Sequence, residues 1–471
     1  MTERVLTDLS IAELGALIKA KEVSPVEAVE ASIQRTDATD PKIGAFITPT
    51  PEPARAAAKV AEQEIMAGRY RGQLHGVPFA LKDLYWTKGV RTASGSRVDS
   101  DFVPVEDGTV VSRLYEAGAI SMGKVHLSEF AFDGLGVNQH YGTPRNPWNT
   151  NHVAGGSSSG SASSVAAGMV PFAMGTDTGG SVRLPASFCG ITGHKPSFGL
   201  VSRHGVTPLS WSMDHPGPLV RTVEDAALVM NAITGHDPRD ASSADIGARD
   251  FTRYLGKGAQ GIRVGVPQEF IWDIIDPEVK AAVEAAIQHL ESLGATVTPI
   301  ALPELSHAGP IFGLTIASEA ATYHREKILA HGDLYDPSIR IRIEGGLFIS
   351  AAAYLHAQRA REAYRRAVAT AMADVDVLAV PTVVVPSPAV GQDRVTMNGV
   401  EHPLRLTILR ASQPFSLIGL PAMSVPCGFT NGGLPIGMQL VGKPFTDDVV
   451  MGAANAYQQS TEWHLRKPRL D

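Results

Sequence analysis

Cysteine is scarce in this chain, since only Cys189 and Cys427 occur among its 471 residues. A disulfide framework is therefore excluded as the basis of the fold, and redox chemistry is not indicated. Excess charge is also lacking: 41 basic and 48 acidic residues give a formal net charge of −7. Because a nucleic-acid surface needs concentrated positive charge, we expect no nucleic-acid partner.

Long apolar runs are absent as well. No uninterrupted run approaches the ~18 residues that suggest a membrane-spanning helix. The first residues, MTERVLTDLSIAEL, carry acids and alternating polarity, where a secretory signal would have a basic segment followed by an apolar one. With so few cysteines, this pattern favours a cytoplasmic protein that does not associate with membranes.

Metal-binding patterns are missing too. The 15 histidines include no H-E-x-x-H motif and no Cys/His spacing suited to zinc. We therefore predict neither a metal nor any other cofactor.

The apolar pattern that is present predicts alternating helices and strands. Residues 10–13 (SIAE) and 24–27 (SPVE) both fit a helix capping box and precede apolar residues at helical spacing. The run HGVPFALK at 75–82 is apolar and bounded by glycine and proline, which predicts a buried strand. Helix-then-strand patterns follow at 108–125 and at 277–300. This alternation predicts a layered α/β architecture.

The stretch from Gly155 to Ser181 has the most unusual composition, beginning GGSSSGSASS and ending MGTDTGGS. We expect a small-residue helix at about 160–167, a buried strand at 170–174 and a glycine turn at 179–180. A Gly/Ser-rich run is more often a flexible linker. A linker, however, would not be followed by a core-like strand and a second glycine turn, so this stretch is a candidate functional site.

Three short motifs nearby match known sites only superficially. Residues 156–160 fit G-x-S-x-G with Ser158 as nucleophile, but NPWNTNHVAG precedes them where a nucleophile elbow needs an apolar strand. Residues 118–124 fit a phosphate-binding loop but continue with valine where Ser or Thr would contact magnesium. Ser121 and Lys124 fit S-x-x-K, yet a strand would point them to opposite faces. We interpret the last two as structural.

Histidine-assisted catalysis remains an alternative. Four histidines lie near the unusual stretch in sequence, and any of them could act as the base for a serine: His126, His152, His194 and His215. The sequence identifies no acid partner for them.

Four segments together resemble the amidase-signature family: GVPFALKD at 76–83, GGSSSGSASSVAAG at 155–168, GTDTGGSVRLPASFCGITGHKPSFGLVSR at 175–203 and GLPAMSVPCGF at 419–429. The correspondence extends, with interruptions, to about Gly442. It implies one amidase-signature domain over 1–471, with a large, mostly parallel or mixed β-sheet covered by helices on both faces. The core motifs would occupy 75–205 and 415–442, and a variable region at about 300–370 would form the substrate pocket.

By motif position, the resemblance makes Ser181 the nucleophile, Ser157 the bridging serine and Lys82 the base. A serine hydroxyl must lose its proton to a neighbouring base as it attacks, and lysine is a base only when neutral. Burial at the end of an apolar strand would favour the neutral amine. The Ser157 hydroxyl both donates and accepts, so it can pass a proton between the other two. The resemblance also implies a cis peptide bond before Ser157.

The glycine turn is expected to form the oxyanion hole with backbone N–H groups of Thr178, Gly179, Gly180 and Ser181. Asp177 and Arg183 flank this turn, and we expect them to fix it as an ion pair without reacting. The substrate pocket is expected to involve Phe132, Asp133, Ser158, the 204–215 segment and the 300–370 region.

Three functions fit these motifs. We favour a stand-alone amidohydrolase that cleaves a small amide, anilide or carbamate through an acyl-enzyme; it would bind a small-molecule substrate, and a homodimer is compatible with it. The second is the amidase subunit of a tRNA-dependent glutamine amidotransferase, which works with partners and ATP. Against it, residues 199–218 lack the run of small residues that normally precedes the Leu-Asp pair. The third is a non-catalytic binding scaffold, against which the retained Lys82, Ser157 and Ser181 count.

Overall fold

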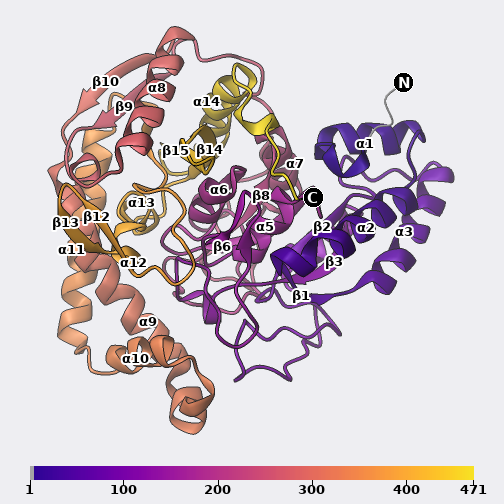
Figure 1. Ribbon diagram of the computed structural model, residues 1–471, viewed down its shortest axis with the longest axis horizontal. Helices are drawn as coiled ribbons and strands as arrows, with labels where there is room; N and C mark the ends of the chain where they lie inside the picture. Colours follow the sequence, from indigo (N-terminus) through magenta and orange to yellow (C-terminus); the bar gives the residue numbers. More distant parts are fainter. Residues whose placement is uncertain (1–4, 471) are drawn as a thin grey trace.

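The computed structural model describes residues 5–470 and builds them around one 11-stranded sheet (Figure 1). Its strands are β1 (Phe46–Pro49), β2 (Pro78–Lys82), β3 (Ile120–Val125), β6 (Phe172–Asp177), β7 (Thr192–Lys195), β8 (His215–Val220), β9 (Arg263–Pro267), β10 (Thr296–Ile300), β11 (Val377–Pro381), β14 (Ala422–Phe429) and β15 (Pro435–Gly442). Two hairpin-like pairs lie outside it: β4 (Arg145–Asn146) with β5 (Asn149–Val153), and β12 (Arg394–Met397) with β13 (Val400–Pro403).

Helices surround the sheet within the described residues: α1 (Ile11–Ala20), α2 (Pro25–Ile43), α3 (Pro51–Met66), α4 (Thr109–Glu116), α5 (Ser159–Ala166), α6 (Arg183–Cys189), α7 (Val223–Ile233), α8 (Pro277–Ser292), α9 (Ala308–His331), α10 (Pro337–Gly346), α11 (Ala351–Ala371), α12 (Leu404–Thr407), α13 (Gln413–Ser416) and α14 (Asp447–Gln459). Short 3-10 turns complete the set: η1 (Leu6–Asp8), η2 (Glu129–Ala131), η3 (Ile271–Asp273), η4 (Pro303–His307), η5 (Gly332–Leu334) and η6 (Trp463–Leu465). Every helix within residues 5–470 is too short or too polar to span a lipid bilayer.

The sheet is mixed, as the resemblance implies. Its order is β1-β3-β2-β6-β8-β7-β14-β15-β11-β9-β10. Strand β2 is parallel to β3 and β6, and β9 is parallel to β10 and β11. Strands β8, β7, β14 and β15 pair antiparallel in the centre.

Both faces of the sheet are covered, because alternate residues of the apolar strands enter two separate cores. Phe79 and Leu81 of β2 belong to the larger hydrophobic cluster, whereas Ala80 belongs to a second one with Ala162 of α5. The strand predicted at 75–82 is therefore present and buried throughout Pro78–Lys82. The expected layered α/β architecture is confirmed.

Local signals place most of these elements correctly. Both predicted capping boxes are formed, with Ser10 accepting from the Glu13 N–H and Ser24 from the Glu27 N–H. The predicted strand at 170–174 begins two residues later, at Phe172, and continues to Asp177. Pro171 explains the later start, because proline has no N–H to donate to a neighbouring strand.

Candidate active site

Lys82 and Ser157 meet in the interior of the protein. Lys82 ends β2, and Ser157 lies just before α5. The Lys82 amine donates to the Ser157 hydroxyl at 2.7 Å and to the Thr176 hydroxyl, on the adjacent strand β6, at 2.8 Å. All three side chains are buried. The fold therefore brings together two residues that are 75 positions apart.

The electrostatic surroundings of Lys82 favour its neutral form. Burial disfavours the ammonium ion and lowers the pKa of Lys82 to about 7, although the charges of Asp214 and Asp177 oppose this shift. A lysine with this pKa is a substantial fraction neutral amine near neutral pH. Its amine can therefore accept a proton, which an ordinary surface lysine cannot do.

Ser181 lies closer to solvent than the other two residues. Its side chain is 8% exposed, whereas Lys82 and Ser157 are fully buried. The Ser181 carbonyl accepts from the Ser158 N–H at 3.3 Å, which ties the glycine turn to the start of α5. No hydrogen bond joins the Ser181 and Ser157 hydroxyls among residues 5–470. The Gly156–Ser157 peptide bond is cis, as the resemblance implies.

The turn after β6 has backbone donors available. In the described chain, the N–H groups of Gly179, Gly180 and Ser181 donate to no protein acceptor. Gly180 has φ +143°, and a Cβ there would overlap a Leu184 methyl carbon. Only glycine therefore fits this position. The Ser412 hydroxyl donates to the Gly179 carbonyl at 2.7 Å and orients that peptide unit.

Asp177 and Arg183 form a two-pronged ion pair beneath this turn. The Arg183 guanidinium donates to the two Asp177 oxygens at 2.9 and 3.0 Å, and both side chains are fully buried. Burial alone would raise the pKa of Asp177, but Arg183 outweighs it and holds the pKa well below the usual range. Asp177 also accepts from the Val182 N–H at 3.2 Å. The ion pair therefore fixes the two ends of the turn relative to each other.

The histidines near the site make their hydrogen bonds elsewhere. His194 bonds to Asp447 at 3.1 Å, and His215 bonds to the Asp177 carbonyl at 2.9 Å. His152 bonds to the Ser387 carbonyl. For the part of the chain that the structure describes, no histidine ring is hydrogen-bonded to any of the three candidate serines, so the Ser-His alternative has no geometric support.

Ser158 sits at the start of α5, with its hydroxyl 3.3 Å from the Thr176 carbonyl. The strand before it, β5, belongs to a separate two-stranded pair and not to the central sheet. The strand-to-helix geometry of a nucleophile elbow is therefore missing. Asp133 pairs with Arg405 at 2.7 Å and accepts from the Leu135 N–H at 2.6 Å, so its carboxylate is already engaged.

A cavity of about 640 Å³ is connected to the glycine turn through Phe312, which lines the cavity and packs on Gly179, although no residue of the turn lines it. It is lined chiefly by aromatic, aliphatic and arginine side chains, among them Phe132, Phe270, Phe312, Ile316, Arg342 and Arg410. The Phe312 ring packs on Gly179, with its Cζ 2.6 Å from where a Cβ would stand. Both guanidinium groups stack on cavity rings, Arg342 on Phe132 at 3.8 Å and Arg410 on Phe270 at 3.7 Å. Burial lowers the pKa of Arg342 to about 10, so it stays cationic near neutral pH.

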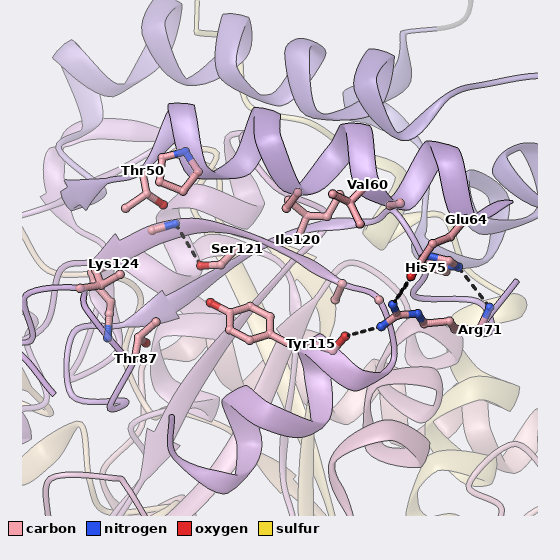
Figure 2. A pocket seen from close by; sticks show the side chains of 17 residues that line it. Thr50, Val60, Glu64, Arg71, His75, Thr87, Tyr115, Ile120, Ser121 and Lys124 are labelled. Carbon is pink, nitrogen blue, oxygen red and sulfur yellow. Dashed lines mark hydrogen bonds and ion pairs between the residues drawn. The ribbon is translucent and has the colours of Figure 1, made fainter. Parts of the chain in front are cut away.

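Figure 2 shows a second pocket, of about 350 Å³, between α3 and β3. Tyr115 lies in its middle, with Glu64 and Arg71 at one end and Lys124 at the other. Glu64 and Arg71 pair with each other at 2.7 Å. The Lys124 amine donates to the Tyr85 carbonyl and to the Thr92 hydroxyl. Glu64 and Arg71 are thus engaged with each other, and Lys124 is engaged with Tyr85 and Thr92. We therefore interpret Lys124, the lysine of the S-x-x-K motif, as structural.

Comparison with known proteins decides the family. The Amidase family model matches residues 27–451. The chain belongs to the amidase-signature family. It is thus an amidase-type hydrolase acting on carbon-nitrogen bonds.

Three relatives illustrate the range of similarity. The A subunit of the glutamyl-tRNA(Gln) amidotransferase of Chloroflexus aurantiacus is 38% identical over 494 aligned residues, covering 100% of both chains. The solved structure of the corresponding protein from Thermotoga maritima is 32% identical, covers 100% of both chains and has a TM-score of 0.84. A chain from a vestigial protein complex that reveals the evolutionary origins of an s-triazine catabolic enzyme is 34% identical, with a TM-score of 0.93, covering 98% of this chain and 100% of that one.

These relatives overturn two expectations. The favoured function, a stand-alone amidohydrolase of a small amide, anilide or carbamate, is wrong, because curated relatives that are 38–39% identical along almost their whole length are named as subunits of an amidotransferase. The expected partners, a small-molecule substrate and at most a second copy, with no nucleic acid, are wrong for the same reason. A net charge of −7 describes this chain alone and carries no information about partner subunits.

The sequence did not single out several residues of this site. The Thr176 hydroxyl accepts a second hydrogen bond from the Lys82 amine, beside the one to Ser157. Asp214 accepts a hydrogen bond from the Thr178 hydroxyl at 2.6 Å. Arg342 and Arg410 line the cavity. Thr176 could have been found as the polar residue that follows an apolar strand. The two arginines carry no local signal, because distant segments bring them together.

Proposed function

We propose that this chain is the amidase subunit of a tRNA-dependent glutamine amidotransferase. It hydrolyses the side-chain amide of glutamine and supplies ammonia to a partner that acts on glutamyl-tRNA. The observation that carries this proposal is the 38% identity, over the full length of both chains, to the A subunit of such an enzyme. The contact between Lys82 and Ser157 supports it, because amide hydrolysis by a serine needs a base.

In the proposed reaction, the Ser181 oxygen attacks the carboxamide carbon of glutamine. Its proton passes to the Ser157 oxygen while the Ser157 proton passes to the neutral Lys82 amine. Negative charge then develops on the former carbonyl oxygen, and the N–H groups of Gly179 and Gly180 stabilise it. These donors need no reorganisation, because the fold already leaves them without protein acceptors.

Collapse of this intermediate returns the proton from Lys82 through Ser157 to the departing nitrogen. Ammonia leaves, and the γ-glutamyl group remains as an ester on Ser181. Water then attacks the ester, using the same base in the same way, and glutamate leaves. In both acylation and deacylation, Lys82 and Ser157 first accept the proton of the attacking hydroxyl or water and then donate it to the leaving group. In acylation this donation is needed because the amide nitrogen leaves only after it is protonated.

The cavity beside the turn suits a substrate with a carboxylate. Arg342 and Arg410 carry positive charge, and Arg342 donates only to the Phe132 carbonyl among the described residues. A guanidinium has five N–H donors, so it can also bind the α-carboxylate of glutamine. Phe312 and Ile316 would contact the methylene groups.

We place the reaction in the cytoplasm, where glutamyl-tRNA is available. Cys189 and Cys427 are both free thiols and buried, which fits a reducing compartment.

The test follows ammonia from glutamine labelled with ¹⁵N in its amide. The chain is assayed alone, and then with its partner subunits, glutamyl-tRNA and ATP. We expect labelled ammonia in a Ser181-dependent reaction and labelled glutaminyl-tRNA in the complete mixture. An ammonium salt should restore glutaminyl-tRNA formation to the complex carrying Ser181→Ala, because the transfer step does not use Ser181. Failure of the complete mixture to make glutaminyl-tRNA would contradict the proposal.

A further inference from the structure

The helix that lines the substrate cavity also touches the glycine turn. Phe312 of α9 packs on Gly179, leaving no room for a side chain there. Figure 1 shows α9 running away from the sheet together with α10 and α11. One end of α9 thus rests on the turn, and its length packs against α10 and α11 as well as other segments. This arrangement makes α9 part of both the pocket wall and the support of the turn.

A second connection starts two helical turns further along the same helix. Glu319 follows Phe312 by seven residues and therefore lies on the same face of α9. Its side chain is fully buried. It accepts from the Ser210 hydroxyl at 2.5 Å, the Ser212 N–H at 3.1 Å and the Tyr354 hydroxyl at 2.9 Å. Glu319 thereby fixes the segment just before β8 against α9.

This segment ends at Asp214, which reaches the turn. Asp214 accepts from the N–H groups of Leu209 and Ser210, both at 2.9 Å, through one oxygen. Its other oxygen accepts from the Thr178 hydroxyl at 2.6 Å. Thr178 directly precedes Gly179 in the turn. A continuous set of hydrogen bonds therefore runs from α9 through Glu319, the 209–214 segment and Asp214 to the turn.

We propose that Glu319 and Asp214 are positioning residues for the oxyanion turn, and that through them the reactivity of Ser181 depends on how α9 is seated. Phe312 and Glu319 hold two points of one helix face, and the turn is attached to both. A displacement of α9 therefore moves the backbone donors relative to the Ser181 hydroxyl. Because such donors act only at the correct distance, a small displacement lowers the rate.

Stability alone does not account for these two buried carboxylates. Neither forms an ion pair within residues 5–470, although Arg361 lies near Glu319 and both Lys82 and Arg203 lie near Asp214. Burying a carboxylate costs desolvation free energy, and hydrogen bonds to it serve to offset that cost. Carboxylates retained in hydrogen-bond networks at the edge of a reactive turn therefore point to positioning of that turn.

The experiment measures Ser181 reactivity without relying on the substrate. A fluorophosphonate probe phosphonylates an activated serine, displacing fluoride, whatever the enzyme's natural acyl group. Its rate is compared between wild type and the variants Glu319→Ala, Glu319→Gln, Thr178→Val and Thr178→Ser. Glu326→Ala is the matched control, because Glu326 is an exposed glutamate on the same helix. Circular dichroism confirms that each variant is folded.

We expect Glu319→Ala and Thr178→Val to slow labelling about tenfold or more, since losing one oxyanion donor costs about a hundredfold. Glutamine hydrolysis should lose kcat with little change in KM. Glu319→Gln and Thr178→Ser, which keep the hydrogen bonds to Ser210 and Asp214, should recover most of the rate. Should Glu319→Ala not fold, Ser210→Ala tests the same link, because it removes the hydrogen bond from the Ser210 hydroxyl to Glu319 and leaves the carboxylate in place.

Two outcomes would overturn the inference. Labelling of folded Glu319→Ala or Thr178→Val at the wild-type rate would overturn it alone. The inference also rests on the proposed role of Ser181, so absence of labelling in the wild-type chain would overturn both. Labelling of wild type without any hydrolysis of glutamine would instead contradict only the proposed substrate.

Discussion

The amine of Lys82 lies 2.7 Å from the hydroxyl of Ser157, at the junction of a buried strand and a small-residue helix. The strand supplies the burial that lowers the pKa of the lysine, and the residue before the helix supplies the hydroxyl that accepts its hydrogen bond. Each partner is ordinary alone. In the proposed mechanism, this pair relays the proton that Ser181 loses.

Alanine substitutions separate the residues of this relay from their neighbours. We expect Ser181→Ala to abolish hydrolysis, and Ser157→Ala or Lys82→Ala to lower kcat about a thousandfold or more, because the three act as a unit. Steady-state kinetics with glutamine measures these losses. Ser158→Ala is the control, and we expect only a mild loss because its hydroxyl contacts the Thr176 backbone. An equal loss in Ser158→Ala would restore the nucleophile-elbow interpretation.

The pH dependence of the reaction should report the ionisation of Lys82. Burial lowers the pKa of Lys82 to about 7, and only the neutral amine accepts the serine proton. We therefore expect kcat/KM to fall as the pH falls below about 7, and to level off above that pH. The negative charge of Asp214 favours the ammonium form of Lys82. Asp214→Asn removes that charge and should therefore lower the pKa of Lys82, which moves the acidic limb of the kcat/KM profile to lower pH. A limb unchanged in position by Asp214→Asn would argue against this control of the lysine.

The buried ion pair under the turn should matter for stability. Asp177→Asn leaves the Arg183 charge without its partner in a fully buried site. Breaking a buried pair in this way typically costs about 3–5 kcal/mol of unfolding free energy. Urea denaturation followed by circular dichroism measures the change. Glu362→Gln, at an exposed pair with Arg365, should leave the unfolding midpoint unchanged, and comparable effects of the two substitutions would contradict this role.

Substrate recognition in the cavity is open to a direct comparison of two amides. Arg342→Met removes a buried cation, and we expect it to raise KM for glutamine about tenfold or more through loss of the carboxylate contact. Hydrolysis of propionamide, which has no carboxylate, should change little. Arg340→Met is the control, because Arg340 is an exposed arginine on the same helix, pairs with Glu344 and does not line the cavity. Equal changes for both amides would show that Arg342 shapes the cavity without binding charge.

Local sequence signals predicted the elements that carry the site, and distant contacts determined the rest. Capping boxes and strict apolar runs placed α1, α2 and β2, because those signals depend on neighbouring residues. Asp214 and Glu319 could not be linked from sequence, since their connection requires the 209–214 segment to pack on α9. The single-domain organisation over 1–471 stays a prediction, which limited proteolysis can test.

The choice among functions shows a different limit. Motifs shared across a family indicate the chemistry of the amide bond, but a stand-alone enzyme and an amidotransferase subunit use the same chemistry. The departure at 199–218 pointed away from the subunit, whereas identity along the full chain points toward it. A departure confined to 20 residues concerns one part of the protein, whereas the identity to the amidotransferase subunit extends over the whole chain.

In the proposed reaction, glutamine transfers its acyl group to Ser181. The most direct measurement mixes the complete complex with glutamine, quenches it in acid within the first turnover and maps the modified peptides by mass spectrometry. We predict a γ-glutamyl group on Ser181 that disappears in Ser181→Ala and accumulates when deacylation is slowed. A γ-glutamyl group on Ser158 or on any other residue, or turnover without an adduct on Ser181, would contradict the account.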